Sequence, residues 1–186
     1  QFTFEVPGAK FMPQYRNKYW DGKIRLFNTQ NGEIYVGLLD KITRFCDDHG
    51  YSYEFVENKF YGLPFEVNEM ISKEGVKDYM NVVSKYAPRD YQVEGVYDAL
   101  KHNRRLLISP TASGKSLMIY SIVRYHVERG QNTLIVVPTT SLVEQMYKDF
   151  ADYGWDVGSY CHKIYAGRER ETNSQVIITT WQSIYK

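Results

Sequence analysis

The chain has 186 residues, a formal net charge of +1, 43% hydrophobic and 24% charged side chains. That length allows one ordinary domain or two small ones, and the composition excludes disordered, collagen-like and fibrous proteins. No apolar run reaches the roughly 18 residues that a membrane helix needs, so we expect a soluble protein with no membrane partner.

The number of cysteines and the N-terminal sequence indicate in which cellular compartment the protein is expected. Only Cys46 and Cys161 are present, with no second Cys or His at zinc-ligand spacing, so neither a disulfide framework nor a metal centre is predicted. The sequence begins with Gln1 and shows no basic leader or apolar signal segment. We therefore expect a cytoplasmic fragment, in the bacterial host cytoplasm if the protein is phage-encoded.

Basic charge is concentrated early in the chain. Residues 9–45 hold seven Lys and Arg against three Asp and Glu, whereas residues 46–85 hold four against eight. Aromatic residues are interleaved with the early basic ones. Such a mixture suits a nucleic acid, because phosphates need cations and bases stack on rings. The alternative is a solvated face over an aromatic core, which composition alone favours.

The first half of the chain predicts a small α+β domain over residues 1–87. Alternation over residues 23–27 predicts a half-buried strand with Lys23 and Arg25 on one face. The turn signal at residues 31–32 predicts a hairpin that returns over residues 33–36. The remaining predicted elements are a helix over 38–49 that stops at Gly50, a strand over 51–56 and a helix over 68–83.

The second half, residues 88–186, alternates between helix and strand patterns. This alternation is typical of a parallel α/β sheet with right-handed crossovers. The predicted buried strands cover residues 105–108, 133–137 and 175–179, and the predicted helices cover 89–101, 115–129 and 141–153. Ser141 and Glu144 predict a capping box at the start of the last of these helices.

The most specific motif runs from Ser109 to Ser116 (SPTASGKS), between a predicted strand and a predicted helix. A loop there turns backbone N–H groups and the positive end of the helix toward a phosphate. Lys115 can reach the β and γ phosphates, and the Ser116 hydroxyl is placed to ligate Mg²⁺. A structural turn is the alternative, since the consensus has Gly where this chain has Ser109. The predicted nucleotide-contacting residues are Pro110, Thr111, Ala112, Ser113, Gly114, Lys115 and Ser116.

Four motifs in this order resemble superfamily 2 helicases and translocases. Residues 110–116 look like their motif I, residues 89–92 (RDYQ) like the adenine-reading Q motif, and residues 137–145 (VPTTSLVEQ) like motif Ia. Residues 179–183 (TTWQS) look like the DNA-contacting motif that follows the next strand. The resemblance implies part of the first RecA-like domain of a P-loop motor.

The N-terminal half is similar to a narrower group. Residues 12–16 (MPQYR), residues 19–26 (YWDGKIRL), residues 37–39 (GLL) and residues 45–51 (FCDDHGY) at the end of the predicted helix resemble the N-terminal domain of UvsW-type phage recombination helicases. These enzymes remodel branched DNA. The resemblance then covers nearly the whole chain and implies a small DNA-substrate domain at residues 1–87, followed by the motor domain.

The resemblance also implies roles for single residues. Gln92 would read the adenine edge and so select ATP, with Arg89 or Tyr86 covering the base, and Lys115 and Ser116 would serve catalysis with Mg²⁺. Thr139 and Thr140 would hold a DNA phosphate, although a plain helix cap is equally compatible. Thr180 and Gln182 lie just past a strand end, where open α/β sheets place ligands.

A basic patch completes the predicted site. The patch consists of Arg16, Lys18, Lys23 and Arg25, and we expect it to contact phosphates of branched, forked or duplex DNA. The alternative is that Arg16 and Arg25 pair with Asp21 and Glu33 and that the face is only solvated.

The resemblance implies an ATP-dependent DNA helicase or branch-migration translocase, of which this chain supplies part of an ATP site. Six residues follow Thr180, and none forms the apolar strand with an acidic end that a Walker B motif needs. We expect the second RecA-like domain, in the C-terminal half, to be the missing partner, and this chain alone to be inactive. The alternatives are the motor of a restriction-type DNA translocase and a non-catalytic DNA-binding module.

Overall fold

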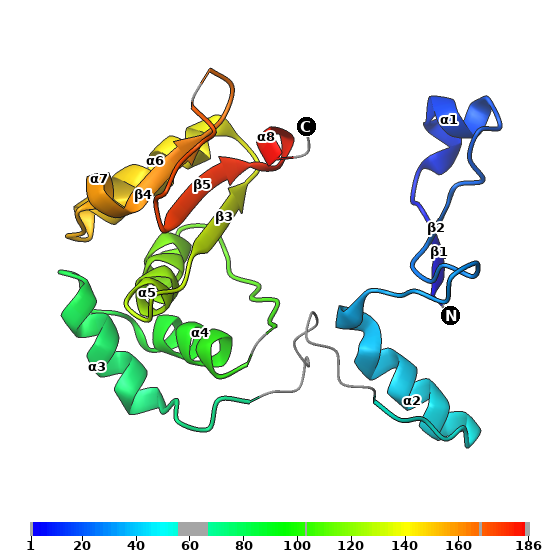
Figure 1. Ribbon diagram of the computed structural model, residues 1–186, viewed down its shortest axis with the longest axis horizontal. Helices are drawn as coiled ribbons and strands as arrows, with labels where there is room; N and C mark the ends of the chain where they lie inside the picture. Colours follow the sequence, from blue (N-terminus) through cyan, green and yellow to red (C-terminus); the bar gives the residue numbers. More distant parts are fainter. Residues whose placement is uncertain (1, 56–66, 103, 168, 185–186) are drawn as a thin grey trace. The chain divides into compact units, whose positions relative to one another are not determined.

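The computed structural model describes residues 2–55, 67–102, 104–167 and 169–184 (Figure 1). The chain divides into two compact units, Gln1–Pro64 and Phe65–Lys186, called unit 1 and unit 2 below. No helix within the described ranges is long and apolar enough to span a membrane.

Unit 1 is built from short elements. Strands β1 (Thr3–Glu5) and β2 (Lys23–Arg25) pair antiparallel, with Phe4 opposite Ile24. Between them lie the 3-10 helix η1 (Ala9–Phe11) and helix α1 (Pro13–Arg16), and after them the 3-10 helix η2 (Val36–Leu38) and helix α2 (Leu39–His49). Among its described residues, Ala9 is the one buried hydrophobic side chain.

Two sequence predictions for unit 1 need correction. The strand at β2 pairs with β1, not with residues 33–36, because the chain turns into η2 at Val36 and leaves only an isolated bridge between Phe27 and Ile34. Residues 51–55 are not in a strand, and Val56 lies outside the described residues. The predicted helix over 38–49 is confirmed, and it ends at Gly50, whose φ of 69° suits a residue without a side chain.

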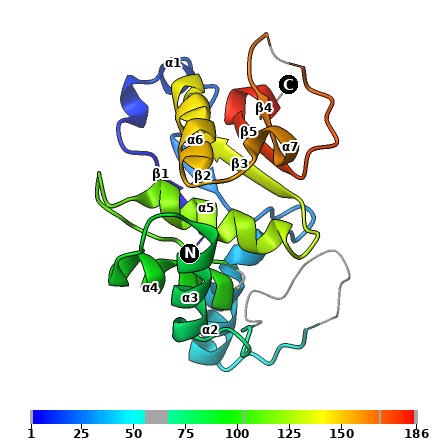
Figure 2. The same cartoon turned by 90° about the vertical axis from the view of Figure 1, so that its left-hand side faces the viewer.

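Unit 2 contains a parallel sheet in the order β3-β5-β4. Its strands are β3 (Thr133–Val137), β5 (Val176–Thr180) and β4 (Cys161–Ile164). Helix α6 (Thr140–Asp152) runs alongside all three strands (Figure 2). The other helices are α3 (Lys73–Val83), α4 (Asp90–Lys101), α5 (Lys115–Val127), α7 (Val157–Tyr160) and α8 (Trp181–Ile184). The predicted α/β class with a parallel sheet is confirmed.

The core of unit 2 explains where the units divide. Tyr120 of α5 is fully buried, packs edge-on against Phe150 and Trp155, and donates a 2.6 Å hydrogen bond to the carbonyl of Val83. Met80 of α3 is also fully buried in this core. Helix α3 therefore belongs to unit 2, and the division falls between residues 64 and 65, earlier than the predicted boundary at residues 87–88.

The strand predicted before the phosphate loop is wrong. Residues 105–108 adopt no regular structure, and Leu106 and Ile108 are 85% and 91% exposed. The three strands of unit 2 described here pair with one another and not with this segment. An apolar run becomes a buried strand only when neighbouring strands satisfy its backbone and a helix covers its face.

The capping box predicted at Ser141 and Glu144 is also wrong. The N-cap of α6 is Thr139, whose hydroxyl accepts a 3.3 Å hydrogen bond from the Leu142 amide. The Glu144 carboxylate instead accepts from the Lys163 ammonium at 2.7 Å and from the Tyr165 hydroxyl. The helix thus keeps a local cap, but at Thr139, while Glu144 forms a tertiary ion pair with Lys163.

Candidate phosphate-binding and DNA-contact sites

The loop from Ser109 to Ser116 leads directly into α5, whose N-cap is Gly114. Ala112 and Gly114 have φ values of 61° and 76°, so the loop alternates through the left-handed region. Within the described residues, the amides of Thr111, Ala112 and Gly114 donate no hydrogen bond to the protein. These amides, at the positive end of a helix, fit the oxygens of a phosphate group.

The Lys115 side chain lies across this loop. Its ammonium donates to the carbonyls of Pro110 at 2.6 Å and Ser109 at 3.2 Å. Phosphate oxygens could replace both carbonyls, since an ammonium carries three donors and no acceptor. The Ser109 hydroxyl, in the place of the consensus Gly, hydrogen-bonds the Ser113 hydroxyl and closes the base of the loop.

Helix α4 braces the loop through one backbone carbonyl. The Ser113 carbonyl accepts from the Gln92 side-chain amide at 2.9 Å and from the Tyr91 hydroxyl at 3.0 Å. The Gln92 side-chain oxygen accepts in turn from the Arg89 amide at 2.8 Å, and Gln92 is 5% exposed. The predicted adenine reader is thus held against the phosphate loop.

Sequence reasoning missed Tyr91. Its hydroxyl accepts from the Arg89 guanidinium at 3.1 Å while donating to the Ser113 carbonyl, so it links the predicted base-covering residue to the loop. The signal available in the sequence was its position between Arg89 and Gln92. Local sequence does not show that residues 91 and 113 meet.

A cavity of about 420 Å³ lies between α4 and the loop. This volume falls in the range of small-molecule sites. Arg89, Tyr91 and Gly95 line it from α4, residues 107–113 line it from the loop side, and Met118 of α5 completes it. The cavity therefore joins Arg89, a predicted base-covering residue, to residues 110–113 of the predicted phosphate loop, whereas the predicted adenine reader Gln92 does not line it.

The Ser116 hydroxyl faces α6. It lies 2.9 Å from the Tyr153 hydroxyl, and Tyr153 packs edge-on against Tyr86. Burial raises the pKa of Tyr153, so this phenol keeps its proton at neutral pH. Because either oxygen can act as donor, the contact leaves a Ser116 lone pair for a cation.

The predicted DNA-contact residues of unit 2 gather at one edge of the sheet. Val137 and Thr180 are register partners at the carboxyl ends of β3 and β5, so Thr139 and Gln182 follow neighbouring strand ends. Thr139 caps α6, while Thr140 and Gln182 are exposed. Thr180 is buried, and its hydroxyl lies 3.0 Å from the Ser183 hydroxyl.

Two of the four residues of the basic patch in unit 1, Lys23 and Arg25, are paired with carboxylates. The Arg25 guanidinium donates to both Asp21 carboxylate oxygens, and the Lys23 ammonium lies 3.6 Å from the Glu5 carboxylate. The pairing of Arg25 with Asp21 matches the alternative stated above. Glu33 does not pair with Arg16 in the described residues, because its carboxylate accepts from the Asn31 side chain at 2.6 Å.

The Asp21–Arg25 pair predicts a displaced titration. The hydrogen bond from Arg25 is the main cause that lowers the pKa of Asp21 from 3.8 to about 2. A depressed folded-state pKa stabilises the fold above about pH 4, and that contribution disappears as the pH falls toward 2. We expect an NMR titration of the Asp21 carboxyl carbon to give a midpoint near 2, and Arg25→Gln to restore an ordinary midpoint. An unchanged midpoint in the variant would disprove the pairing.

Two known families match the chain. The family described as "Type III restriction enzyme, res subunit" matches residues 85–186, which is more than half of the sequence. The chain belongs to this family. The family described as "DNA helicase UvsW, N-terminal" matches residues 1–56, most of unit 1.

Known relatives agree with both matches. The chain is 32% identical over 196 aligned positions to the "ATP-dependent DNA helicase uvsW" of Enterobacteria phage T4, covering 100% of this chain and 38% of that protein. One crystal structure of T4 UvsW matches with a TM-score of 0.80 at 32% identity, with the same coverage of both chains. A second matches with a TM-score of 0.78 at 31% identity, covering 98% of this chain and 66% of that one. The predicted resemblance to UvsW-type helicases is confirmed.

Proposed function

We propose that this chain is part of an ATP-dependent DNA helicase or branch-migration translocase that remodels branched DNA in recombination, repair or replication. The observation that carries the proposal is the loop of residues 109–116. Backbone amides without a protein partner and the Lys115 ammonium belong to this one loop at a helix start, and helix α4 braces the loop through the Ser113 carbonyl. The match of unit 1 to the UvsW N-terminal family favours this function over a restriction-type translocase, since that segment lies outside the restriction-family match.

The residues present fit ATP and Mg²⁺. The amides of residues 111–114 and the Lys115 ammonium would hold phosphates, and the Ser116 hydroxyl would ligate the cation. Bound Mg²⁺ would neutralise charge on the phosphate oxygens. Lys115 would add a positive charge on the same oxygens, and Tyr91 with Gln92 would keep the loop carbonyl of Ser113 turned away from them.

The DNA track of the motor would lie at the carboxyl edge of the sheet. Thr140 and Gln182 are exposed there, and the capping residue Thr139 presents its hydroxyl beside them. Thr180 is buried and would act by holding Ser183 in place. These groups would bind phosphates without reading sequence. We propose that such a protein works on DNA in the cytoplasm of a host cell.

This chain alone is expected to bind Mg²⁺-ATP weakly and to show no DNA-stimulated hydrolysis. The reason is that no acidic residue follows Ser174, so the sequence offers no Walker B carboxylate to position a metal and an attacking water. Isothermal titration measures the binding, and a phosphate-release assay with and without forked DNA measures the turnover. Hydrolysis by this chain that depends on Lys115 would contradict the proposal that the carboxylate needed for hydrolysis lies in another part of the motor.

The restriction-type translocase is the second candidate, because its family matches unit 2. A longer protein that contains this chain and the remaining motor domain would decide between the two. A helicase displaces a strand from a forked substrate with ATP, whereas a translocase of the restriction type moves along the duplex without separating it. ATP-dependent displacement of a labelled strand supports the helicase, and ATP turnover on duplex DNA without displacement supports the second candidate.

A further inference from the structure

The segment from Val6 to Trp20 carries positive charge without acidic residues. It contains Lys10, Arg16 and Lys18 and not one Asp or Glu. Two acidic residues flank it, but the Glu5 carboxylate pairs with Lys23 and the Asp21 carboxylate pairs with Arg25. Acidic partners therefore neutralise the positive charges on β2, whereas the charges of Lys10, Arg16 and Lys18 before it have no acidic residue in their segment.

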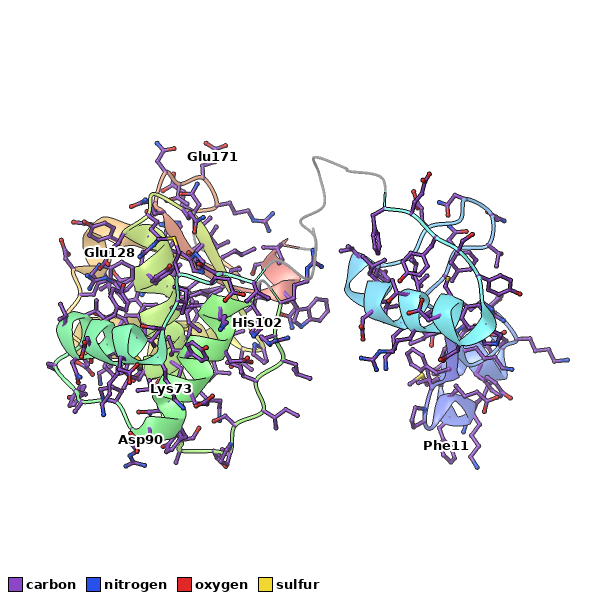
Figure 3. The ribbon with its side chains drawn as sticks, turned by 90° about the horizontal axis from the view of Figure 1, so that it is seen from below. Phe11, Lys73, Asp90, His102, Glu128 and Glu171 are labelled. Carbon is purple, nitrogen blue, oxygen red and sulfur yellow. The ribbon has the colours of Figure 1, made fainter. Side chains whose placement is uncertain are left out.

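The same segment presents aromatic rings. Tyr19 is 85% exposed and Phe11 is 67% exposed, and Figure 3 shows Phe11 at the margin of unit 1. The Lys10 ammonium lies 5.1 Å from the centre of the Phe11 ring, so a cation and a ring occupy neighbouring positions.

Neighbouring residues hold the segment in place. Trp20 donates a 2.8 Å hydrogen bond from its ring nitrogen to the carbonyl of Lys23. The Tyr15 ring and Ala9 pack so closely on Gly22 that a side chain there would lie 3.0 Å from each of them. Lys18 has a φ of 59°, a conformation rare for a residue with a side chain, immediately before the exposed Tyr19. The exposed rings thus project from an anchored backbone.

We propose that Lys10, Phe11, Arg16, Lys18 and Tyr19 form a contact surface for single-stranded DNA, called the aromatic–basic surface here. Phe11 and Tyr19 stack on unpaired bases, and the three cations bind phosphates. Lys23 and Arg25 instead stabilise the β1–β2 pair and the turn before it. The inference rests on the proposed function and names which part of unit 1 contacts the DNA and which form of DNA it contacts.

Single strands fit this surface better than duplex DNA does. The faces of bases are covered in a duplex and free in a single strand, so exposed rings gain little from paired DNA. Phosphate contacts would serve both forms equally. The test therefore measures the contribution of the rings to DNA affinity separately from that of the cations.

The first experiment measures the rings. Fluorescence anisotropy compares the 186-residue chain with its Phe11→Ala and Tyr19→Ala variants on a labelled oligo-dT strand and on a duplex of equal length. We expect each variant to lose roughly five-fold or more in affinity for the single strand and much less for the duplex. The matched control is Tyr35→Ala, because Tyr35 is 71% exposed in the same unit but lies outside the surface. Equal losses for Tyr35→Ala and Tyr19→Ala would overturn the stacking role.

The second experiment measures the cations. Replacing Lys10, Arg16 and Lys18 together with Gln should reduce the slope of log affinity against log salt by about 2 on the single strand, about 0.7 for each lost phosphate contact. The comparison variant, Lys23→Gln with Arg25→Gln, should leave the slope nearly unchanged. Far-UV circular dichroism checks that each variant retains its secondary structure. A triple variant with the wild-type slope would overturn the inference, as would a larger slope change in the double variant.

The outcomes separate this inference from the proposed function. If the unaltered chain binds no DNA, both the DNA role of the chain and the aromatic–basic surface are wrong. If the chain binds DNA but the surface variants bind equally well, the surface alone is wrong. In that case the sheet edge near Thr140 would remain the candidate DNA site.

Discussion

Lys115→Ala is expected to weaken Mg²⁺-ATP binding by this chain by roughly 10- to 100-fold. The Lys115 ammonium is the cation that lies across the loop, with its donors on the carbonyls of Pro110 and Ser109. A hydrogen bond between charged groups contributes about 1.5–3 kcal/mol, and every 1.4 kcal/mol changes a dissociation constant ten-fold. Titration with a fluorescent ATP analogue, in the presence of Mg²⁺, measures the loss.

The loss should be larger in catalysis than in binding. In a longer protein that contains the remaining motor domain, Lys115→Ala should abolish ATP turnover, because this ammonium would contact charge that develops in the transition state. Lys148→Ala is the matched control, since Lys148 is exposed on α6 of the same unit and lies far along the chain from the loop. Normal steady-state turnover in the Lys115 variant would rule out the phosphate-site assignment.

The sequence predicted those elements that local forces determine. Helix α2 follows from its apolar stripe and from Gly50 at its end, and β3 follows from a run of β-branched and apolar residues. The left-handed loop before α5 agrees with the glycine, lysine and serine spacing at residues 114–116, and its phosphate-binding role stays a prediction. In each case the residues that decide the structure are close together in the chain.

The misses came from tertiary contacts. Residues 105–108 have the composition of a buried strand, yet the described strands leave them unpaired and exposed. Glu144 has the spacing of a cap, but Lys163 offers it a charged partner 19 residues away in sequence. The brace of Tyr91 and Gln92 on Ser113 spans more than 20 residues, so no local pattern could predict it.

Because Gln92 is held against the loop, Gly114→Ala is expected to cause a large loss in the free energy of unfolding. A methyl group on Gly114 would lie 2.3 Å from the side-chain nitrogen of Gln92, and the backbone there has a φ of 76°. Gln92 can retreat only by giving up its hydrogen bonds to the Ser113 carbonyl and the Arg89 amide. Left-handed strain of about 1–2 kcal/mol and two hydrogen bonds of about 1 kcal/mol each predict a loss near 3 kcal/mol.

A matched glycine isolates the two causes. Gly130 has a φ of 72° and no atom within 4 Å of the position its side chain would take, so Gly130→Ala carries the backbone strain alone. Urea unfolding should therefore show that Gly114→Ala lowers the free energy of unfolding by about 2 kcal/mol more than Gly130→Ala does. Equal losses would mean that Gln92 moves away freely and does not brace the loop.

The decisive measurement is the double variant of Gly114→Ala with Gln92→Ala. Removing the Gln92 side chain removes the clash but keeps the left-handed strain at residue 114, so the double variant should be more stable than the sum of the two single losses predicts. We expect a coupling of about 1–2 kcal/mol, since the bonds that Gly114→Ala breaks are the same ones that Gln92→Ala has already removed. The affinity for Mg²⁺-ATP should show the same coupling, because the Ser113 carbonyl that Gln92 holds belongs to the loop that would receive the phosphates. Strict additivity in both measurements would place Gln92 outside the phosphate site and leave adenine recognition as its remaining role.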